Sequence, residues 1–246
     1  THLKTEKMPG DKIPLNPLRK TVPNIISPYP GHKNTPLGTF AELPPGIRSF
    51  FPDGHNMVRV GVDDDGSCFY HTLVAGLNIN NWHSMILKER YHHGRNLRKK
   101  IAEYLSETTW RKYWAGKGVS AKAVPSVEKM KKDLNNYRTW ADVYAIMYVA
   151  HVLGLNVLVF DFVSEQIYCG THNEDNANNT LFIAWIEHSH FEPILEITKE
   201  NNVFGSFDKK SPVLGFVMNK YKEQGCPAVS LQQILLRARR ARRARR

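Results

Sequence analysis

The hydrophobic pattern of this chain changes its period abruptly, and this change constrains the fold more than any other feature. Valines alternate with other residues through residues 58–62, as side chains do in a strand. A polar stretch with three aspartates and a glycine occupies residues 63–67. Beyond it, apolar residues recur with the spacing of a buried helix at Phe69, Leu73 and Leu77. The pattern predicts a strand or extended segment that enters a tight turn and then a buried helix.

Cys68 lies just ahead of the predicted helix. At a helix N-terminus, unpaired backbone N–H groups and the positive end of the helix dipole stabilise a thiolate, which makes the sulfur more nucleophilic at neutral pH. Gly66 allows a turn tight enough for backbone amides to point at an oxyanion. A lone cysteine is also commonly a small buried hydrophobic residue, and the local pattern leaves that interpretation open.

A second polar site lies far downstream, at residues 188–193. A cysteine nucleophile needs a base, and the base needs an acceptor that orients it; Cys68, His190 and Glu192 match these three roles. His190 and Glu192 are two positions apart, so on one strand both side chains lie on the same face. This pair favours the nucleophile interpretation of Cys68 over the buried hydrophobic one.

Three blocks of the chain, in this order, resemble the ovarian-tumour (OTU) family of cysteine deubiquitinases. Residues 65–71, Asp-Gly-Ser-Cys-Phe-Tyr-His, resemble its Asp-Gly-x-Cys signature. Residues 140–160 resemble its tryptophan-led helix followed by a central strand, and residues 190–192, His-Phe-Glu, resemble its terminal histidine motif. The chain departs from the family at Ser67, where asparagine is usual, and at Glu192, where a shorter aspartate or asparagine is usual.

The resemblance implies an α+β fold of the papain superfamily, with a small central sheet between helical layers. It implies an OTU-type cysteine protease that needs no cofactor and acts on ubiquitin or a ubiquitin-like modifier. Cys68 would attack the carbonyl of the modifier's C-terminal glycine, His190 would transfer the protons, and Glu192 would orient His190.

The resemblance further implies an oxyanion hole built from three backbone amides, those of Asp65, Gly66 and Cys68. Asp65 would therefore act through its main chain. We expect that neither Asp64 nor Asp65 orients His190 from the turn.

The chain of 246 residues fits one domain of ordinary size with extensions. Residues 1–57 hold ten of the 14 prolines but also many apolar residues, so we expect an extended arm that packs on its own domain or a neighbour, with a floppy leader as the alternative. The cysteine protease domain is expected at residues 58–199. A C-terminal extension at 200–229 and a short amphipathic helix with an arginine-rich tail at 230–246 would follow it.

Within the domain, the pattern predicts a polar loop at residues 78–83 and a basic helical region at 84–108 that Gly94 interrupts. A further helix would be capped by Thr139 with Asp142 as its capping-box partner. Four strands are expected in the remainder of the domain, at residues 157–160, 166–170, 181–186 and 190–197. Residues 204–207 and 213–216 are expected to pack as loops or an extra strand.

The net charge of +11 is concentrated at one end of the chain. Seven arginines lie between Arg237 and Arg246, so the rest of the chain carries only +4 (11 minus 7). Such a tail binds nucleic acid, anionic lipid or an acidic protein surface, or directs nuclear import. With the arm, it suggests a second interpretation, a structural component of a larger assembly. Divergent sequences with an aspartate run before the cysteine resemble those of large DNA viruses, which makes a virion one such assembly.

Three cysteines without a C-x-x-C pair favour a reducing compartment, so we expect the cytoplasm or nucleus, or the host cell cytoplasm and the virion if the protein is viral. The eleven histidines include the neighbours His92 and His93, but no carboxylate cluster joins them, and we expect no metal site. No apolar run is long enough to predict a membrane span.

Overall fold

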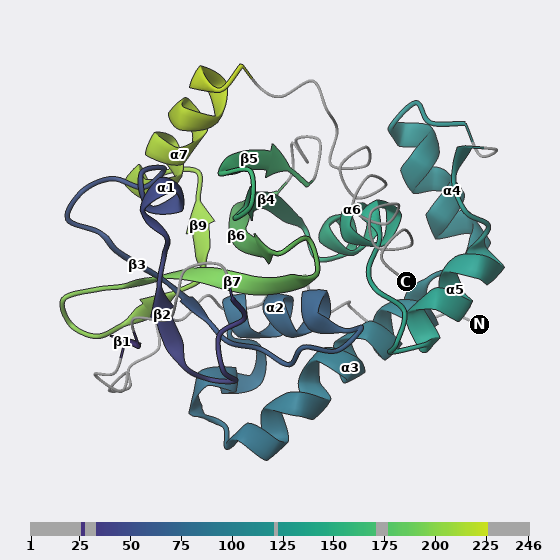
Figure 1. The fold of residues 1–246 in the computed structure, drawn as a ribbon. Coiled ribbons are helices and arrows are strands. Elements are labelled where there is room, and N and C mark those ends of the chain that lie inside the picture. Colours follow the sequence, from purple (N-terminus) through teal and green to yellow (C-terminus); the bar gives the residue numbers. More distant parts are fainter. Residues whose placement is uncertain (1–25, 28–32, 121–122, 171–176, 226–246) are drawn as a thin grey trace.

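A computed structural model describes residues 26–27, 33–120, 123–170 and 177–225 of the chain. It consists of a mixed sheet between two groups of helices, and the α+β fold class expected from the sequence is confirmed (Figure 1). Residues 230–246, where the sequence predicts the amphipathic helix and arginine tail, lie outside the described residues.

Within the described ranges the sheet has nine strands, and seven of them follow the order β1-β2-β3-β7-β6-β4-β5. β8 pairs with β7 and β9 pairs with β6. The β1–β2 and β4–β6 pairs are parallel, and the remaining pairs are antiparallel. The strands are β1 Ile26–Ser27, β2 Phe40–Glu42, β3 Asn56–Val60, β4 Leu155–Asp161, β5 Gln166–Cys169, β6 Asn179–Ile186, β7 His190–Ile197, β8 Val203–Phe204 and β9 Ser206–Asp208.

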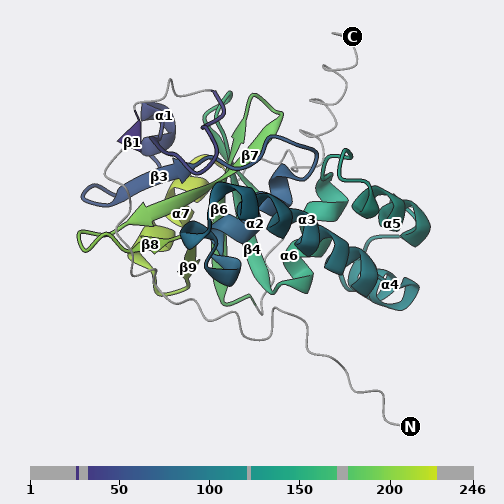
Figure 2. The same cartoon turned by 90° about the horizontal axis from the view of Figure 1, so that it is seen from below.

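The larger core lies between one face of the sheet and a group of five helices (Figures 1 and 2). These helices are α2 Cys68–Gly76, α3 Leu87–Tyr104, α4 Glu107–Gly116, α5 Val127–Asn135 and α6 Val143–Val152. The helix α2 is buried along its whole length and packs against β7, so even its polar residues His71 and Thr72 are buried. Its position brings the cysteine end of α2 to the histidine end of β7.

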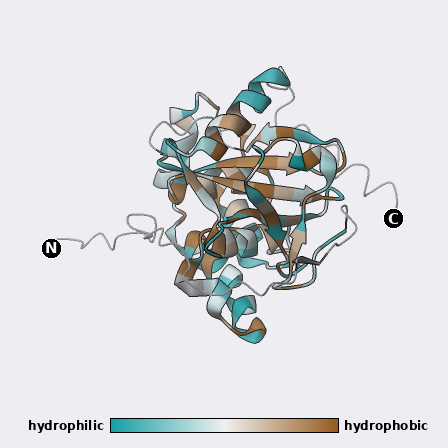
Figure 3. Cartoon of the chain, turned by 90° about the vertical axis from the view of Figure 1, so that its left-hand side faces the viewer, coloured by the Kyte–Doolittle hydropathy of each residue, from teal (hydrophilic) through white to brown (hydrophobic). Residues whose placement is uncertain are grey.

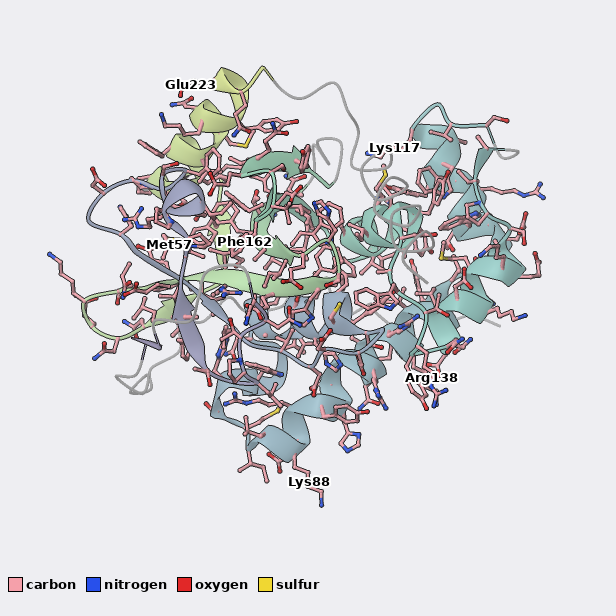
Figure 4. All side chains as sticks on the ribbon, in the orientation of Figure 1. Met57, Lys88, Lys117, Arg138, Phe162 and Glu223 are labelled. Atoms are coloured by element: carbon pink, nitrogen blue, oxygen red, sulfur yellow. The ribbon has the colours of Figure 1, made fainter. Side chains whose placement is uncertain are left out.

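The opposite face of the sheet is covered by α1 Pro45–Arg48 and α7 Pro212–Glu223. In β4, Val157 and Val159 face the first core while Leu158 and Phe160 face this second one. The prediction of a strand buried on both faces is therefore confirmed. Figure 3 shows the apolar strands in the interior, and Figure 4 places Met57 and Phe162 among packed side chains.

Three local predictions are wrong, the first because of a tertiary contact and the other two because a different local cap is used. Gly94 does not interrupt the basic helix: α3 continues through it, because only a glycine leaves room for the His71 ring, whose Nδ1 would lie 2.2 Å from an added Cβ. Asp142 rather than Thr139 caps α6, and its carboxylate accepts the Ala145 N–H at 3.0 Å. Residues 213–216 belong to the helix α7, which Ser211 caps.

The polar loop predicted at residues 78–83 forms a 3₁₀ helix, Ile79–Ser84, in which Trp82 is buried. Upstream of the domain start expected at residue 58, β2 pairs with β3 and α1 contributes Ile47 to the second core. The segment before β2 lies against Gly61: Leu37 forms a parallel bridge with it, and the Gly38 N–H donates to its carbonyl at 2.9 Å. Part of the proline-rich segment therefore packs on the domain. In the part of the chain described here, no helix combines the length and apolarity needed to span a membrane.

Candidate active site

Cys68 is the first residue of α2 and is almost completely buried. The α2 helix is tied to the neighbouring strand β7 by the Thr72 hydroxyl, which donates to the Phe191 carbonyl at 2.8 Å. The rings of Phe69 and Phe191 pack edge to face, with their centroids 5.9 Å apart. These contacts hold the N-terminus of α2 beside the first residue of β7, which is His190.

His190 is fully buried between two carboxylates. Its Nδ1 lies 3.3 Å from Asp64 Oδ1, and its Nε2 lies 3.5 Å from Glu192 Oε1. Both are ion-pair distances rather than well-aligned hydrogen bonds. Burial by itself lowers the pKa of His190, but the contacts with Asp64, Cys68 and Glu192 outweigh it and hold the pKa well above its ordinary value. The imidazole therefore holds its proton more tightly than an exposed histidine does.

Glu192 has no exposed surface, and four contacts satisfy its carboxylate. Oε1 accepts the Thr35 backbone N–H at 2.5 Å and faces the His190 ring. Oε2 accepts the Thr35 hydroxyl at 2.8 Å and Arg59 Nη1 at 3.1 Å. The additional methylene of glutamate thus does not prevent contact with His190, because donors from two other segments hold the carboxylate in place.

The Asp65 carboxylate braces the turn ahead of Cys68 rather than reaching the imidazole of His190. Its Oδ1 accepts the Ser67 N–H at 2.7 Å and lies 3.3 Å from His71 Nε2, and its Oδ2 accepts Arg95 Nη2 at 2.8 Å. Partial burial acts to raise the pKa of Asp65, but the hydrogen bonds from His71, Arg95 and the Ser67 amide lower it to about 2. Asp65 is therefore ionised at neutral pH.

The expectation that Asp64 would not reach His190 from the turn is wrong, because the Asp64 carboxylate faces His190 Nδ1. The Asn34 side-chain amide donates to its second oxygen at 2.8 Å. The contact with His190 is the main reason why the pKa of Asp64 is lowered.

Some backbone N–H groups of the turn already donate hydrogen bonds within the protein, whereas others are available to a ligand. The Ser67 amide donates to the Asp65 side chain, and the Cys68 amide donates to the Asp65 carbonyl at 3.1 Å. Among the residues that the structure describes, the amides of Asp65 and Gly66 have no acceptor. Gly66 packs directly on another segment, since an added Cβ would lie 2.4 Å from the Tyr137 carbonyl oxygen.

The buried guanidinium of Arg98 joins the turn to the loop on which Gly66 packs. It donates from Nη1 to the Gly66 carbonyl at 2.9 Å and to Ser67 Oγ at 3.0 Å. It also donates to the backbone carbonyls of Asp133 and Leu134 in the last turn of α5 and of Thr139 in the loop that follows. The serine at position 67, where the resembled family has asparagine, therefore has a defined partner.

The structure thus brings together Cys68, His190 and Glu192, and it keeps the Asp65 side chain apart from them. Sequence reasoning missed Thr35, Arg59 and Arg98. A weak signal existed for the two arginines: Arg59 lies between two valines of a strand, and Arg98 follows Leu97 on the apolar side of a helix. Thr35 carries no such signal. No group of three histidine, cysteine or carboxylate side chains suited to a metal ion occurs in the described ranges.

Comparison with known proteins shows similarity only at the level of structure. No protein-family sequence model matches the chain, and no curated protein matches its sequence. An ovarian-tumour (OTU) domain solved in complex with ubiquitin is 18% identical, covers 70% of this chain and 90% of its own, and superposes with a TM-score of 0.46.

Two further solved structures are similar. The Hazara virus OTU bound to ubiquitin is 18% identical, covers 58% of this chain and 83% of its own, and has a TM-score of 0.38. An OTU deubiquitinase from Wolbachia pipientis is 14% identical, covers 69% and 98%, and has a TM-score of 0.36. At these levels of similarity, function has to be inferred from the geometry of the site itself.

Proposed function

We propose that this protein is a cysteine isopeptidase that removes ubiquitin or a ubiquitin-like modifier from its conjugates. The observation that carries the proposal is the His190 imidazole, which is buried in contact with the Cys68 thiol and has Glu192 on its Nε2 side. An imidazolium next to a thiol at a helix N-terminus stabilises the thiolate, which is the nucleophilic form. The OTU-like motifs around Cys68 and His190 support ubiquitin or a relative as the substrate class.

In the proposed reaction, the Cys68 thiolate attacks the carbonyl carbon of the modifier's C-terminal glycine, and the carbonyl oxygen becomes an oxyanion. The free amides of Asp65 and Gly66 are the candidate donors to it. The Cys68 amide, which the sequence also suggested, would first have to leave the Asp65 carbonyl.

The tetrahedral intermediate collapses when the bond to the lysine nitrogen breaks and His190 gives its proton to the departing amine. This leaves a thioester between Cys68 and the modifier. The neutral His190 then takes a proton from a water molecule, whose oxygen attacks the thioester carbonyl. Collapse of this intermediate breaks the C–S bond and regenerates the thiolate and imidazolium. The released carboxylic acid gives its proton to solvent, from which the released amine takes one, so all protons balance over the cycle.

A ubiquitin that carries a C-terminal thiol-reactive warhead tests this proposal. We expect a covalent adduct that is lost in Cys68→Ala and kept in the matched variants Cys169→Ala and Cys226→Ala. The same warhead on ubiquitin-like modifiers identifies the preferred substrate. An adduct on Cys169, or the absence of an adduct with every modifier, would contradict the proposal.

The arginine tail supports a second role, attachment to an anionic partner. Seven positive charges separated from a nearly balanced domain suit nucleic acid or an acidic protein surface, including one inside a virus particle. This role is compatible with catalysis, because the tail begins more than forty positions after His190.

A further inference from the structure

Three consecutive residues between β1 and β2 contact the groups that hold the catalytic histidine. The Lys33 carbonyl accepts a hydrogen bond from Arg59 Nη1 at 2.8 Å. The Asn34 side chain donates to Asp64. Thr35 donates to Glu192. Asp64 and Glu192 are the two carboxylates on the two nitrogens of His190. One short segment therefore reaches both sides of the imidazole through its immediate partners.

The contact with Glu192 is the stronger of the two, because it is buried and double. Thr35 donates from its backbone N–H at 2.5 Å and from its hydroxyl at 2.8 Å, one to each carboxylate oxygen. Thr35 is 3% exposed and Glu192 is 0% exposed. Hydrogen bonds to a charged group in such a dry environment are worth more than neutral ones, and they restrict the rotation of a long side chain.

The second contact, between Asn34 and Asp64, affects the other imidazole nitrogen of His190, Nδ1. The Asp64 side chain is 55% exposed, so without a restraint it could turn toward water. The Asn34 amide at 2.8 Å from its second oxygen holds it facing His190 Nδ1. Since Glu192 lies on the Nε2 side, Asp64 acts on the opposite nitrogen of the imidazole, and both carboxylates help to keep the pKa of His190 raised.

The segment itself has little freedom to move. Its continuation is hydrogen-bonded to β3's end on both sides of Gly61: Gly38 donates to the Gly61 carbonyl at 2.9 Å, and Gly61 donates to the Thr39 carbonyl at 3.0 Å. The backbones are so close that an added Cβ on Gly61 would lie 2.1 Å from the Pro36 carbonyl oxygen. A fixed backbone is what a positioning element needs, because its hydrogen bonds are then already oriented.

We infer that residues 33–35 are a positioning element of the active site, which sets the orientation of His190 through Glu192 and holds Asp64 against its Nδ1. This inference rests on the proposed function for its kinetic consequences, although its effect on the titration of His190 does not. The proline-rich region before the catalytic domain therefore includes part of the catalytic apparatus. A simple packing role for Thr35 is the alternative, and it predicts an effect on stability alone.

The kinetic test is Thr35→Val in the full-length chain, which removes the hydroxyl and keeps the shape and the backbone N–H. We expect kcat on a fluorogenic ubiquitin substrate to fall about tenfold, the consequence of a misplaced catalytic group, with KM nearly unchanged. Thr35→Ser keeps the hydroxyl and should therefore retain most of the wild-type kcat. Thr39→Val is the matched control, because among the described residues the Thr39 hydroxyl makes no hydrogen bond. Equal kcat values for Thr35→Val and Thr39→Val, both folded, would overturn the inference.

The second test follows the His190 imidazole by NMR as the pH is raised and needs no substrate. Asp64→Asn removes a negative charge from Nδ1, so His190 should lose its proton at a pH about one unit lower, and Asn34→Ala should shift it in the same direction by less. Unchanged titration in both variants would refute the part of the inference that concerns Asp64. If the wild type formed no adduct with any modifier while these shifts occurred, the proposed function would fail and the positioning element would stand.

Discussion

Arg59 and Glu192 form an ion pair with 0% exposure of either side chain, with Nη1 and Oε2 3.1 Å apart across 133 positions of the chain. Removing one member of a buried pair leaves the other charge without compensation. Glu192→Gln should therefore lower the free energy of unfolding by about 3 kcal/mol, measured by urea denaturation. The double variant Arg59→Met/Glu192→Gln should recover part of this loss, whereas additive losses would show that the pair is not coupled.

Glu192 should matter less for turnover than His190 does. The glutamine retains an oxygen that can face His190 and accept from Thr35, while His190→Ala removes the proton carrier itself. Hydrolysis of a fluorogenic ubiquitin substrate by the folded fraction should thus fall further in His190→Ala than in Glu192→Gln. Losses of equal size would mean that the carboxylate charge is indispensable to catalysis.

Gly66→Ala should disrupt the turn ahead of Cys68. The new methyl group would meet the Tyr137 carbonyl at 2.4 Å, a backbone atom that cannot move aside cheaply. We expect at least a hundredfold slower labelling by the ubiquitin warhead. Gly215→Ala is the control, since nothing lies within 4 Å of a Cβ there and alanine should stabilise α7 by up to about 1 kcal/mol. Normal labelling of Gly66→Ala would show that the close packing is not needed.

The stability contributed by Asp65 should depend on pH in the acid range. Its pKa is lowered to about 2 in the folded chain, so the contribution is present at neutral pH, above the unfolded value of 3.8, and is lost as the pH falls through 2. The side chain is 22% exposed, and we expect about 1–2 kcal/mol after solvent screening. Urea unfolding of wild type and Asp65→Asn at pH 7 and at pH 3 measures this. If the difference in unfolding free energy between the two proteins did not shrink at pH 3, the effect of Asp65 would come from packing and not from its charge.

The arginine tail should govern binding and not catalysis. Each phosphate that an arginine neutralises releases counterions, so retention on nucleic acid should fall steeply with salt. A chain that ends at Leu236 should lose retention at moderate salt while its cleavage of a small ubiquitin substrate barely changes. The prediction fails if the truncated chain loses catalysis and still binds, because the tail would then belong to the active domain.

The order of strands and helices around the site could be read from the sequence because it depends on local period. The alternation before Asp63, the buried run of β4 and the strand that begins at His190 appear in the structure as the pattern predicts. Predictions failed where a distant group changed the local preference. The His71 ring next to Gly94 is one example. The cap of α6 was mispredicted for a local reason, because Asp142 rather than Thr139 accepts the Ala145 N–H.

In the candidate site, too, some features follow from the sequence pattern and others from tertiary contacts. The sequence alone determined Cys68, His190 and Glu192 as candidates, because the chemistry of a nucleophile, a base and an orienting carboxylate leaves a recognisable spacing. Only the tertiary structure decided what holds them: Thr35 meets Glu192 across 157 positions, and Asp64 turns toward His190. Such contacts exist only after β3 and β7 have paired and the segment before β2 has packed on Gly61. No pattern of neighbouring residues encodes them, because the partners share no local period.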